Sequence, residues 1–354
     1  MDLPRITEDL PGITGRLRTR PEDFVVEEIP AYEPSGTGPH TYVRITKRGL
    51  TSTEVRERLA RLFGLRPHDI GMAGLKDRHA VTTQTFSIPQ VDPDEALRRI
   101  QEAFPDLVVH EARRHANKLK PGHLRGNRFR IVLREAAPED AFSRAQAIAR
   151  RLREVGAPNY YGPQRFGKYG DNAERGKALL LGRMRLRDKW LRKFLLSAYQ
   201  SALFNAYLAE RIRRGWFTRI LAGDIAKKAD TGGLFLVEDP AKEQPRYHRG
   251  EIHFTGPMYG YKLWQAQGEP GALEEAILRR EGLSLDDFRR GKLKGTRRLG
   301  RLWLPDLTVT EDGQGNLVFA FTLPKGAYAT AVLREFLRDD ALLTSLERDA
   351  PEEA

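Results

Sequence analysis

The sequence predicts an α+β fold with a mixed, largely antiparallel sheet backed by helices. Segments with the two-residue alternation of strands and segments with the repeat of helices follow one another in mixed order. No glycine-rich fingerprint of a parallel, nucleotide-binding sheet occurs among them. The length of 354 residues is sufficient for two domains.

The first part of the chain contains both kinds of element. Residues 41–46 (TYVRIT) alternate as a strand with one solvent-facing side, and residues 127–134 (NRFRIVLR) place Phe129, Ile131 and Leu133 on one face. Further strands are expected at residues 14–19, 24–29, 83–88 and 107–119. Helices are expected at residues 53–63, 94–104 and 138–155.

The helix that follows the TYVRIT segment has a signal at each end. Ser52 or Thr53 is expected to be its N-cap, because a hydroxyl can accept a hydrogen bond from the first turn. Gly64 is expected to end it. The apolar residues between them recur at helical spacing, so one face of this helix should be buried.

The pattern changes from residue 156 onward. Residues 156–158 break the preceding helix, and a loop is expected as far as residue 172. The elements expected after the loop are a long helix at 190–214, a hairpin-like pair at 223–238 and a helix at 271–281. Residues 287–301 are mostly arginine, lysine and glycine, which predicts an exposed link.

The last part of the chain resembles the first more than the middle. The elements expected there are strands at 302–310 and 317–323 and a helix at 327–338. We therefore predict a first domain over residues 1–155, an inserted domain over 156–302 and a terminal segment, 303–354, that returns to the first domain.

The composition narrows the class of protein. Lysine and arginine number 60 against 48 aspartates and glutamates, a net charge of +12. Such an excess favours a polyanionic partner, most commonly RNA or DNA. The absence of cysteine excludes disulfides, thiolate nucleophiles, cysteine zinc sites and iron–sulfur clusters. No signal peptide and no run of ~18 apolar residues is present, so we expect a soluble, cytoplasmic protein without a membrane partner.

One loop concentrates the chemistry. In residues 74–87 (GLKDRHAVTTQTFS), Asp77 stands between Lys76 and Arg78, with His79 beside them. A lone aspartate among cations is a poor site for a divalent metal, which needs several oxygen ligands. Nearby positive charge lowers a carboxylate pKa, so Asp77 should stay ionised beside an anionic substrate. An exposed salt-bridge loop is the alternative for this tripeptide taken alone.

Four other segments combine glycine, aromatic and polar residues. They are LRTRPEDF at 17–24, LRGNRF at 124–129, PNYYGPQRFG at 158–167 and LPKGAYAT at 323–330. Each has a structural alternative. Phe129 can be a core residue, Asn127 a turn former, and the Tyr-Tyr-Gly-Pro loop a rigid surface turn.

Together these segments resemble the TruD family of pseudouridine synthases. The sequence GLKDRHAVTTQTFS is similar to the catalytic motif of that family, GNRF to its Gly-Asn-x-Phe motif, and NYYGPQRFG to its Asn-Tyr-Phe/Tyr-Gly-x-Gln-Arg-Phe-Gly motif. LRTRPEDFVVEE and LPKGAYATAVLRE are similar to its N-terminal and C-terminal segments. The resemblance runs in order from about residue 15 to 336, and residues 227–297 match least.

The resemblance implies the pseudouridine synthase fold with an inserted α/β TRUD domain, and a role for each motif residue. Asp77 is expected to be the catalytic carboxylate, either as a nucleophile at carbon or as the base that removes a ribose proton. Arg18 is expected to pair with Asp77, and Asn127 to hydrogen-bond near it and hold the loop. Phe129 is expected to stack on the target uracil. Neither metal nor cofactor is implied.

The implied substrate is tRNA, most commonly its uridine at position 13 in the D-arm. That base must leave its stack to reach the pocket, so basic surface is needed to offset the cost through phosphate contacts. RNA contacts are expected from the loop and the basic run after it: Lys76, Arg78, His79, Arg113, Arg114, Lys118 and Arg125. Gln164, Arg165 and Phe166 are expected to border a site between the domains. A solvated strand face is the alternative for the basic run.

Two other functions compete with this one. A non-catalytic, structured-RNA-binding protein of the same fold would be expected to lose or neutralise its carboxylate, yet Asp77, Asn127 and Phe129 are all present. A metal-dependent nuclease or phosphotransferase would require clustered carboxylates. We therefore expect a monomeric tRNA pseudouridine synthase that uses Asp77 without metal or cofactor.

Overall fold

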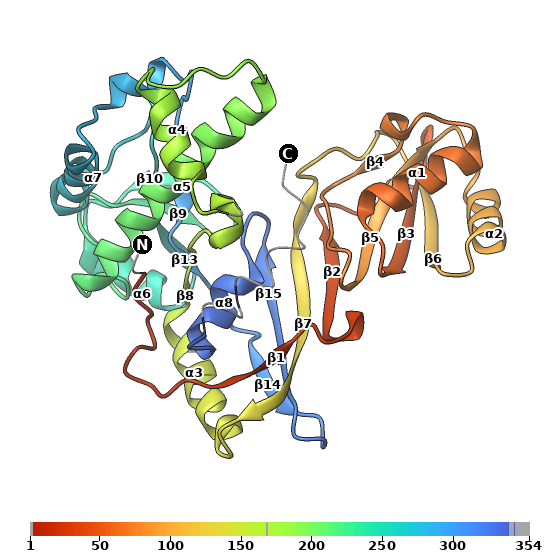
Figure 1. Cartoon of the computed structure of the whole chain (residues 1–354), viewed down its shortest axis with the longest axis horizontal. Coiled ribbons are helices and arrows are strands. Elements are labelled where there is room, and N and C mark those ends of the chain that lie inside the picture. The colour runs from red at the N-terminus through yellow and green to blue at the C-terminus, as the bar shows by residue number, and fades with distance from the viewer. Residues whose placement is uncertain (1–2, 168, 340–342, 344–354) are drawn as a thin grey trace. The chain divides into compact units, whose positions relative to one another are not determined.

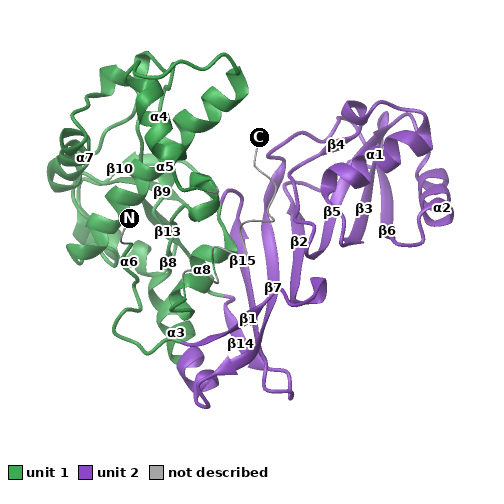
Figure 2. Cartoon of the chain, viewed as in Figure 1, with its two compact units in different colours: residues 1–12, 147–305, 327–347 green, residues 13–146, 306–326, 348–354 purple. Residues whose placement is uncertain are grey.

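The chain forms two compact units in a computed structural model that describes residues 3–167, 169–339 and 343 (Figure 1). Figure 2 colours them separately. Unit 1 comprises residues 1–12, 147–305 and 327–347, and unit 2 comprises 13–146, 306–326 and 348–354. The division into residues 1–155, 156–302 and 303–354 stays a prediction.

Unit 2 is built on one large sheet. Within the described residues its strand order is β14-β15-β7-β2-β5-β3-β6, with β1 also on β7 and β4 on β5. The strands are β1 (Thr14–Leu17), β2 (Phe24–Pro30), β3 (His40–Arg48), β4 (Gly71–Met72), β5 (Val81–Pro89), β6 (Val108–His115), β7 (Leu124–Ala137), β14 (Thr308–Glu311) and β15 (Leu317–Pro324). All their pairings are antiparallel except that of β2 with β5. The predicted mixed, largely antiparallel α+β architecture is confirmed.

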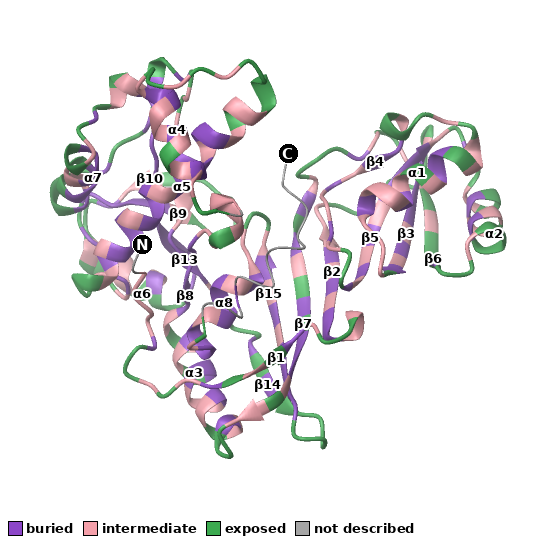
Figure 3. Ribbon diagram, viewed as in Figure 1, coloured by how far each residue is buried: buried purple, intermediate pink, exposed green. Residues whose placement is uncertain are grey.

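Two helices pack on one face of this sheet. They are α1 (Ser52–Phe63) and α2 (Pro93–Ala103). Val55 and Leu59 of α1 share a buried cluster with Val43 and Ile45 of β3 and with Phe86 of β5. Figure 3 shows that buried residues concentrate along the strands. The opposite face of β3 and β6 keeps polar side chains, as expected for an antiparallel sheet with one solvated face.

The N-cap of α1 is Thr51, so the prediction of Ser52 or Thr53 is wrong by one or two positions. Thr51 Oγ1 accepts a hydrogen bond from the backbone N–H of Glu54 at 3.1 Å, and the Glu54 carboxylate accepts from the backbone N–H of Thr51 at 2.6 Å. This reciprocal pair is a capping box. Gly64 ends the helix with φ at 66°, as predicted.

Unit 1 combines helices with two small sheets. Its helices are α4 (Asn172–Leu180), α5 (Lys189–Arg213), α6 (Pro240–His248), α7 (Gly268–Arg280) and α8 (Ala329–Phe336), and α3 (Ala141–Val155) runs from unit 2 into unit 1. The first sheet has the order β10-β9-β11-β12, from β9 (Ile225–Lys228), β10 (Leu234–Leu236), β11 (Ile252–Met258) and β12 (Thr296–Leu299). The second pairs β8 (Ala157–Pro158) with β13 (Arg301–Leu302).

The prediction that residues 287–301 form an exposed link is wrong. The segment contains β12, and its Arg297 and Arg301 are buried. Arg297 pairs with the buried carboxylate of Glu274 at 2.6 Å. The Arg301 guanidinium lies 3.5 Å from the ring centroid of Tyr247 and donates to the carbonyl of Tyr247 at 2.6 Å. The prediction from composition failed because arginine side chains can be buried when their N–H groups have hydrogen-bond or ion-pair partners.

Gly126 of the GNRF motif is required by strand spacing. A Cβ at this position would lie 2.1 Å from the carbonyl oxygen of Leu323 on the neighbouring strand β15. That distance is far inside contact, and the obstructing atom is backbone, so a side chain would push β7 and β15 apart. The motif therefore constrains the sheet itself as well as the residues that follow.

Gly126→Ala is expected to lower the free energy of unfolding by about 1–3 kcal/mol, the usual cost of forcing extra volume into a packed interior. Urea denaturation followed by circular dichroism would measure it. Gly233→Ala is the control, because its added Cβ would meet only the Thr231 hydroxyl at 3.4 Å. Equal stability of the two variants would contradict the steric reading.

Candidate active site

Asp77 lies in the loop between β4 and β5 and forms a buried ion pair. Arg18 donates from Nη2 to its Oδ2 at 2.6 Å, and the exposed fractions of the two side chains are only 9% for Arg18 and 17% for Asp77. Arg18 directly follows β1 and has a φ of 51°, an unusual conformation for a residue with a side chain. Its guanidinium lies 4.1 Å from the ring centroid of Phe24. The structure thus contains the pair that the motifs predicted.

A second group of polar side chains holds the backbone of the loop. Lys47 Nζ donates to the carbonyl of Asp77 at 2.9 Å. The backbone N–H of Lys76 donates to the hydroxyl of Ser52 at 2.8 Å, and Gln84 donates to the carbonyl of Gly74 at 3.2 Å. Ser52 in turn donates to the side chain of Gln84 at 2.5 Å. Lys47, Ser52 and Gln84 are all buried, so the loop backbone is held from the interior of the sheet.

Lys76 makes its own buried ion pair beneath the loop. Its ammonium lies 3.1 Å from the carboxylate of Glu28, with 7% and 2% of the two side chains exposed. Glu28 also accepts from the backbone N–H of Thr85 at 3.3 Å. Lys76 was predicted to contact RNA. Within the described residues its ammonium already pairs with the carboxylate of Glu28 in β2.

Strand register places these groups on one face of the sheet. Glu28 is opposite Asn127, and Val26 is opposite both Phe129 and Thr82. Lys47 is also opposite Thr82. Residues directly opposite one another in a sheet point to the same side. Glu28, Lys47, Asn127 and Phe129 therefore share the face on which α1 packs.

Phe129 is packed between two other phenylalanines on that face. Its ring centroid is 6.1 Å from that of Phe24, edge to face, and 5.6 Å from that of Phe321, stacked. Only 7% of Phe129 is exposed. The Arg18 guanidinium also lies over the ring of Phe24. A continuous chain of contacts therefore leads from Phe129 through Phe24 and Arg18 to Asp77. This packing agrees with the core alternative, and the role as a base platform stays a prediction.

Asn127 has an unused acceptor. Within the described part of the chain, its side-chain oxygen is buried and accepts no hydrogen bond. No hydrogen bond joins Asn127 to Asp77 among these residues, so the predicted role in holding the loop stays a prediction. A buried amide oxygen that accepts no hydrogen bond lowers the stability of the folded protein. This favours a bound ligand that supplies the missing hydrogen-bond donor.

Burial opposes the charge of Asp77. Removal from water raises the pKa of Asp77 above its ordinary value of 3.8, while Arg18, Lys47 and Lys76 each act to lower it. From the sequence we expected the pKa of Asp77 to be lowered overall by the neighbouring cations. That expectation was wrong because it considered only the neighbouring charges and omitted the cost of removing the carboxylate from water. Burial also lowers the pKa of Lys47 to about 8, although Asp77 opposes that shift.

The other cations predicted to contact RNA are dispersed. Arg78 pairs with Glu54 at 2.6 Å, and His79 is exposed beside it. Arg113 lies 3.6 Å from Glu33, and Arg114 lies 3.2 Å from Asp92. Because Arg113 and Arg114 are consecutive in β6, they point to opposite faces of the sheet. The basic run is therefore not one continuous surface.

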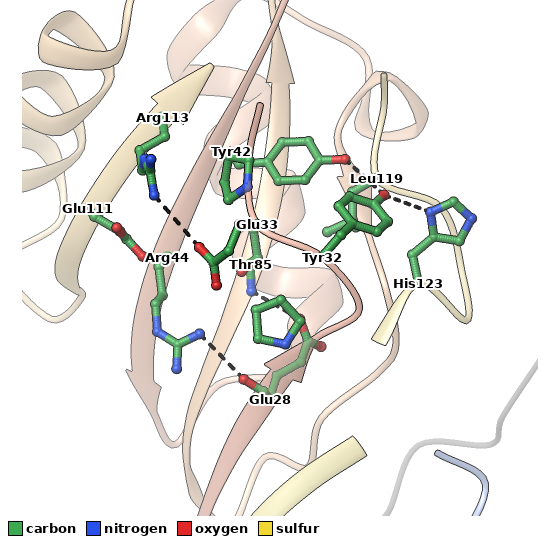
Figure 4. Close-up of a pocket in the computed structure, with 12 residues that line it drawn as sticks. Glu28, Tyr32, Glu33, Tyr42, Arg44, Thr85, Glu111, Arg113, Leu119 and His123 are labelled. Carbon is green, nitrogen blue, oxygen red and sulfur yellow. Dashed lines mark hydrogen bonds and ion pairs between the residues drawn. The ribbon is translucent and has the colours of Figure 1, made fainter. Parts of the chain in front are cut away.

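Lys118 lies in the connection from β6 to β7, and Arg125 is the second residue of β7. Lys118 donates to the carbonyl of His68, and Arg125 is exposed. Arg113 also lines a pocket of about 250 Å³ between β3, β6 and residues 30–34 (Figure 4). Tyr32 lies in this pocket and hydrogen-bonds to His123 at 2.8 Å. The pocket is on the face of the sheet opposite Lys47, because it is lined by Tyr42 and Arg44.

Gln164, Arg165 and Phe166 belong to unit 1, in a short 3-10 turn at Pro163–Phe166. Arg165 donates to the hydroxyls of Ser197 and Ser201 on α5, the latter at 3.2 Å. Their proximity to Asp77 stays a prediction. In the described residues, no group of three or more His, Cys, Asp or Glu could hold a metal ion, and no helix is long and apolar enough to cross a membrane.

The family comparison decides the class of protein. The profile described as tRNA pseudouridine synthase D (TruD) matches residues 2–187 and 184–336. The chain belongs to the TruD family. The predicted pseudouridine synthase, an isomerase, is thereby confirmed, and the motifs that carried the resemblance lie within the matched residues.

Individual relatives agree along the whole chain. A protein named tRNA pseudouridine synthase D from Anaeromyxobacter sp. (strain Fw109-5) is 49% identical over 98% of this chain and 99% of its own length. One of the same name from Thermus thermophilus is 45% identical over 99% and 96%. A TruD crystal structure from Methanosarcina mazei has a TM-score of 0.79 and 25% identity, covering 95% of this chain and 96% of that one.

Sequence reasoning missed Lys47 and Glu28, although a signal for both was present. Lys47 continues the buried side of β3 after Val43 and Ile45, and Glu28 continues the buried side of β2 after Phe24. A charged residue in register with buried neighbours must have a buried partner. Strand parity alone could therefore have identified both residues as part of the polar cluster.

Arg18→Ala is expected to raise the pKa of Asp77 further, because Arg18 is the nearby charge that lowers this pKa most. At any fixed pH in the titration range, a smaller fraction of Asp77 would then be ionised. A pH titration of aspartate carboxyl carbons by NMR would measure this. Arg16→Ala is the control, since Arg16 is exposed and pairs with Glu135 at 3.2 Å; an equal shift in both variants would contradict the role of the ion pair.

Proposed function

We propose that this chain isomerises a uridine of tRNA to pseudouridine, with Asp77 as the catalytic carboxylate and the uridine at position 13 of the D-arm as its target. The observation that supports this most directly is the buried Arg18–Asp77 ion pair, whose two residues lie within the part of the chain that the family profile matches. The names of the relatives supply the tRNA substrate. The sheet of unit 2 would be the catalytic domain, and part of unit 1 the inserted TRUD domain.

The reaction moves one bond of the nucleoside. The bond between N1 of uracil and C1′ of ribose breaks, the base turns, and C5 bonds to C1′; C5 then loses its proton and N1 gains one. Asp77 in its ionised form can serve either as the nucleophile or as the base at the ribose. Arg18 orients the carboxylate, and Lys47 fixes the backbone at Asp77 through its carbonyl. Both are positioning residues.

The two remaining motif residues would receive the base. Phe129 would stack on the uracil, and the unused buried oxygen of Asn127 offers an acceptor to a donor that comes with the substrate or the loop. Phenylalanine has no hydroxyl, so Phe129 cannot remove the C5 proton. Water or another group would accept it.

Asp77→Asn is expected to reduce turnover by at least about 10³-fold, because the amide has neither the charge nor the basicity of the carboxylate. Tritium release from tRNA transcripts labelled at uracil C5 would measure turnover, and mapping of the product would test position 13.

Activity of the wild type in the presence of a metal chelator would distinguish this mechanism from that of a metal-dependent enzyme. Binding without product by the wild type would favour the non-catalytic RNA-binding alternative, and full activity of the variant would exclude Asp77 as the catalytic group.

The pH dependence follows from the same carboxyl group. Because burial raises the pKa of Asp77 above 3.8, its ionised fraction at a given pH is smaller than that of an ordinary aspartate and increases as the pH rises through the raised pKa. Single-turnover rates should rise with pH along an acid limb whose midpoint exceeds 3.8, and Arg18→Ala should move that midpoint to higher pH. A midpoint unchanged by the substitution would argue against Asp77 as the titrating group.

Phe129→Leu is expected to lower turnover by roughly tenfold or more if the ring supports the uracil, since base–aromatic stacking is worth ~1–3 kcal/mol. Phe321→Leu is a matched control, because Phe321 is buried in the same ring stack. Both variants should lose stability in urea to a similar degree. Equal turnover by the two variants would assign Phe129 to the core alone.

A further inference from the structure

A basic segment of unit 1 lies outside every motif considered above. Residues 183–193 contain six cations and one acidic residue, Asp188. The cations are Arg183, Arg185, Arg187, Lys189, Arg192 and Lys193. Asp188 is used as the N-cap of α5, where it accepts from the backbone N–H of Leu191 at 2.9 Å. The segment is therefore strongly positive at the point where α5 begins.

These cations differ from several other arginines on the surface of the same unit. Arg249, for example, pairs with Glu251 at 2.6 Å, and Arg279 pairs with Glu275 at 2.8 Å. In the part of the chain that the structure describes, none of the six cations of 183–193 lies within ion-pair distance of a carboxylate. All except Arg192 are exposed. Their mutual repulsion is thus not offset by the protein.

A second basic segment lies beside the first. Arg192 donates to the backbone carbonyl of Arg290 at 3.3 Å. The Arg290 guanidinium is also close to Gly182, 3.2 Å from the position that a Cβ would take there. Arg290, Lys292 and Lys294 are all exposed. Two segments about a hundred residues apart in the sequence therefore add their positive charge on one surface, which favours an extended polyanion.

An exposed indole stands within this surface. Trp190 is 46% exposed, and its ring is parallel to that of Phe194 one helical turn later, with centroids 5.5 Å apart and an angle of 4°. On Phe194 lies the guanidinium of Arg165, 5.5 Å from the ring centroid. Arg165 is itself held by Ser197 and Ser201. The indole is thus supported by a fixed stack and keeps exposed ring surface for a flat ligand.

We propose that residues 183–193 and 290–294 form an RNA-binding surface, with the cations on phosphates and Trp190 beneath one unpaired base. A row of unpaired cations with an aromatic platform matches single-stranded nucleic acid, whose bases stack and whose backbone carries regular charge. An acidic protein would satisfy the cations but leaves the exposed indole unexplained. The inference rests on RNA as the substrate of the proposed function, and it assigns binding, not chemistry, to this surface.

The charges are tested by reversal. Arg185→Glu/Arg187→Glu is expected to raise the Kd for an unmodified tRNA transcript by more than about tenfold and to reduce the dependence of log Kd on log salt by roughly 1.4, about 0.7 for each lost phosphate contact. Arg249→Glu/Arg279→Glu is the matched control, because it changes the net charge of the same unit equally. Fluorescence anisotropy at two salt concentrations would measure both. Equal weakening by the two double variants would overturn the assignment of this surface.

The stacking is tested separately. Trp190→Ala is expected to raise the Kd by about 5- to 100-fold, the usual effect of removing a base-stacking ring, and Trp190→Phe should retain most of the affinity. Trp264→Ala is the control, since Trp264 is also 46% exposed in unit 1. Wild-type affinity of Trp190→Ala, or a Trp264→Ala defect of the same size, would overturn the base platform. Thermal unfolding of each variant, together with Arg185→Gln/Arg187→Gln, would separate binding defects from misfolding.

The readouts distinguish this inference from the proposed function. Single-turnover rates at sub-saturating enzyme should fall with the loss of affinity in the Arg185/Arg187 and Trp190 variants, whereas the Arg249→Glu/Arg279→Glu control, which lies outside the surface, should keep the wild-type rate. If the wild type binds tRNA but makes no pseudouridine, the proposed reaction fails, while the comparison of Kd values still decides the surface. If the wild type does not bind tRNA, the RNA-binding surface is overturned as well.

Discussion

The candidate site depends on charges that the sheet carries on its buried face. Lys47 and Glu28 project from β3 and β2 toward the side covered by α1, where unpaired charge costs several kcal/mol. The loop at residues 74–77 supplies their partners: the carbonyl of Asp77 for Lys47 and the ammonium of Lys76 for Glu28. The contacts that satisfy the buried charges of Lys47 and Glu28 therefore also hold the loop, and in this position of the loop Asp77 pairs with Arg18.

Much of this could be predicted because it is local. The alternation of β3 and β7, the helical repeat of α1 and its glycine stop all appear in short windows of sequence. The ion pair between Arg18 and Asp77 joins residues 59 positions apart, and only the family resemblance brought them together. Residue pattern alone indicates that Asp77 is unusual, but it does not say which of the many arginines is its partner.

The interior of unit 1 was least predictable, for a physical reason. Arg211 and Asp224 pair at 2.7 Å with almost no exposure, and Arg297 and Glu274 do the same at 2.6 Å. Composition treats such residues as surface, so residues 287–301 were expected to be exposed. The strand β11 (Ile252–Met258) was missed although its first four residues alternate between apolar and polar, because Gly256 and Pro257 in the same strand are typical of turns. All seven of its residues are buried, including His253 and Thr255. High charge and turn-forming residues can therefore both occur in a protein core.

Burial and ion pairing have opposite effects on the pKa of Asp77, and both effects suit a carboxylate with a chemical role. Burial raises its pKa and makes the charged form more reactive, because fewer water molecules stabilise it. Arg18, Lys47 and Lys76 act in the other direction, because their positive charges favour the ionised form. A surface salt bridge would achieve neither effect, since water would screen both charges. The 9% and 17% exposure of Arg18 and Asp77 is therefore the property that separates this pair from the many exposed pairs of the same chain.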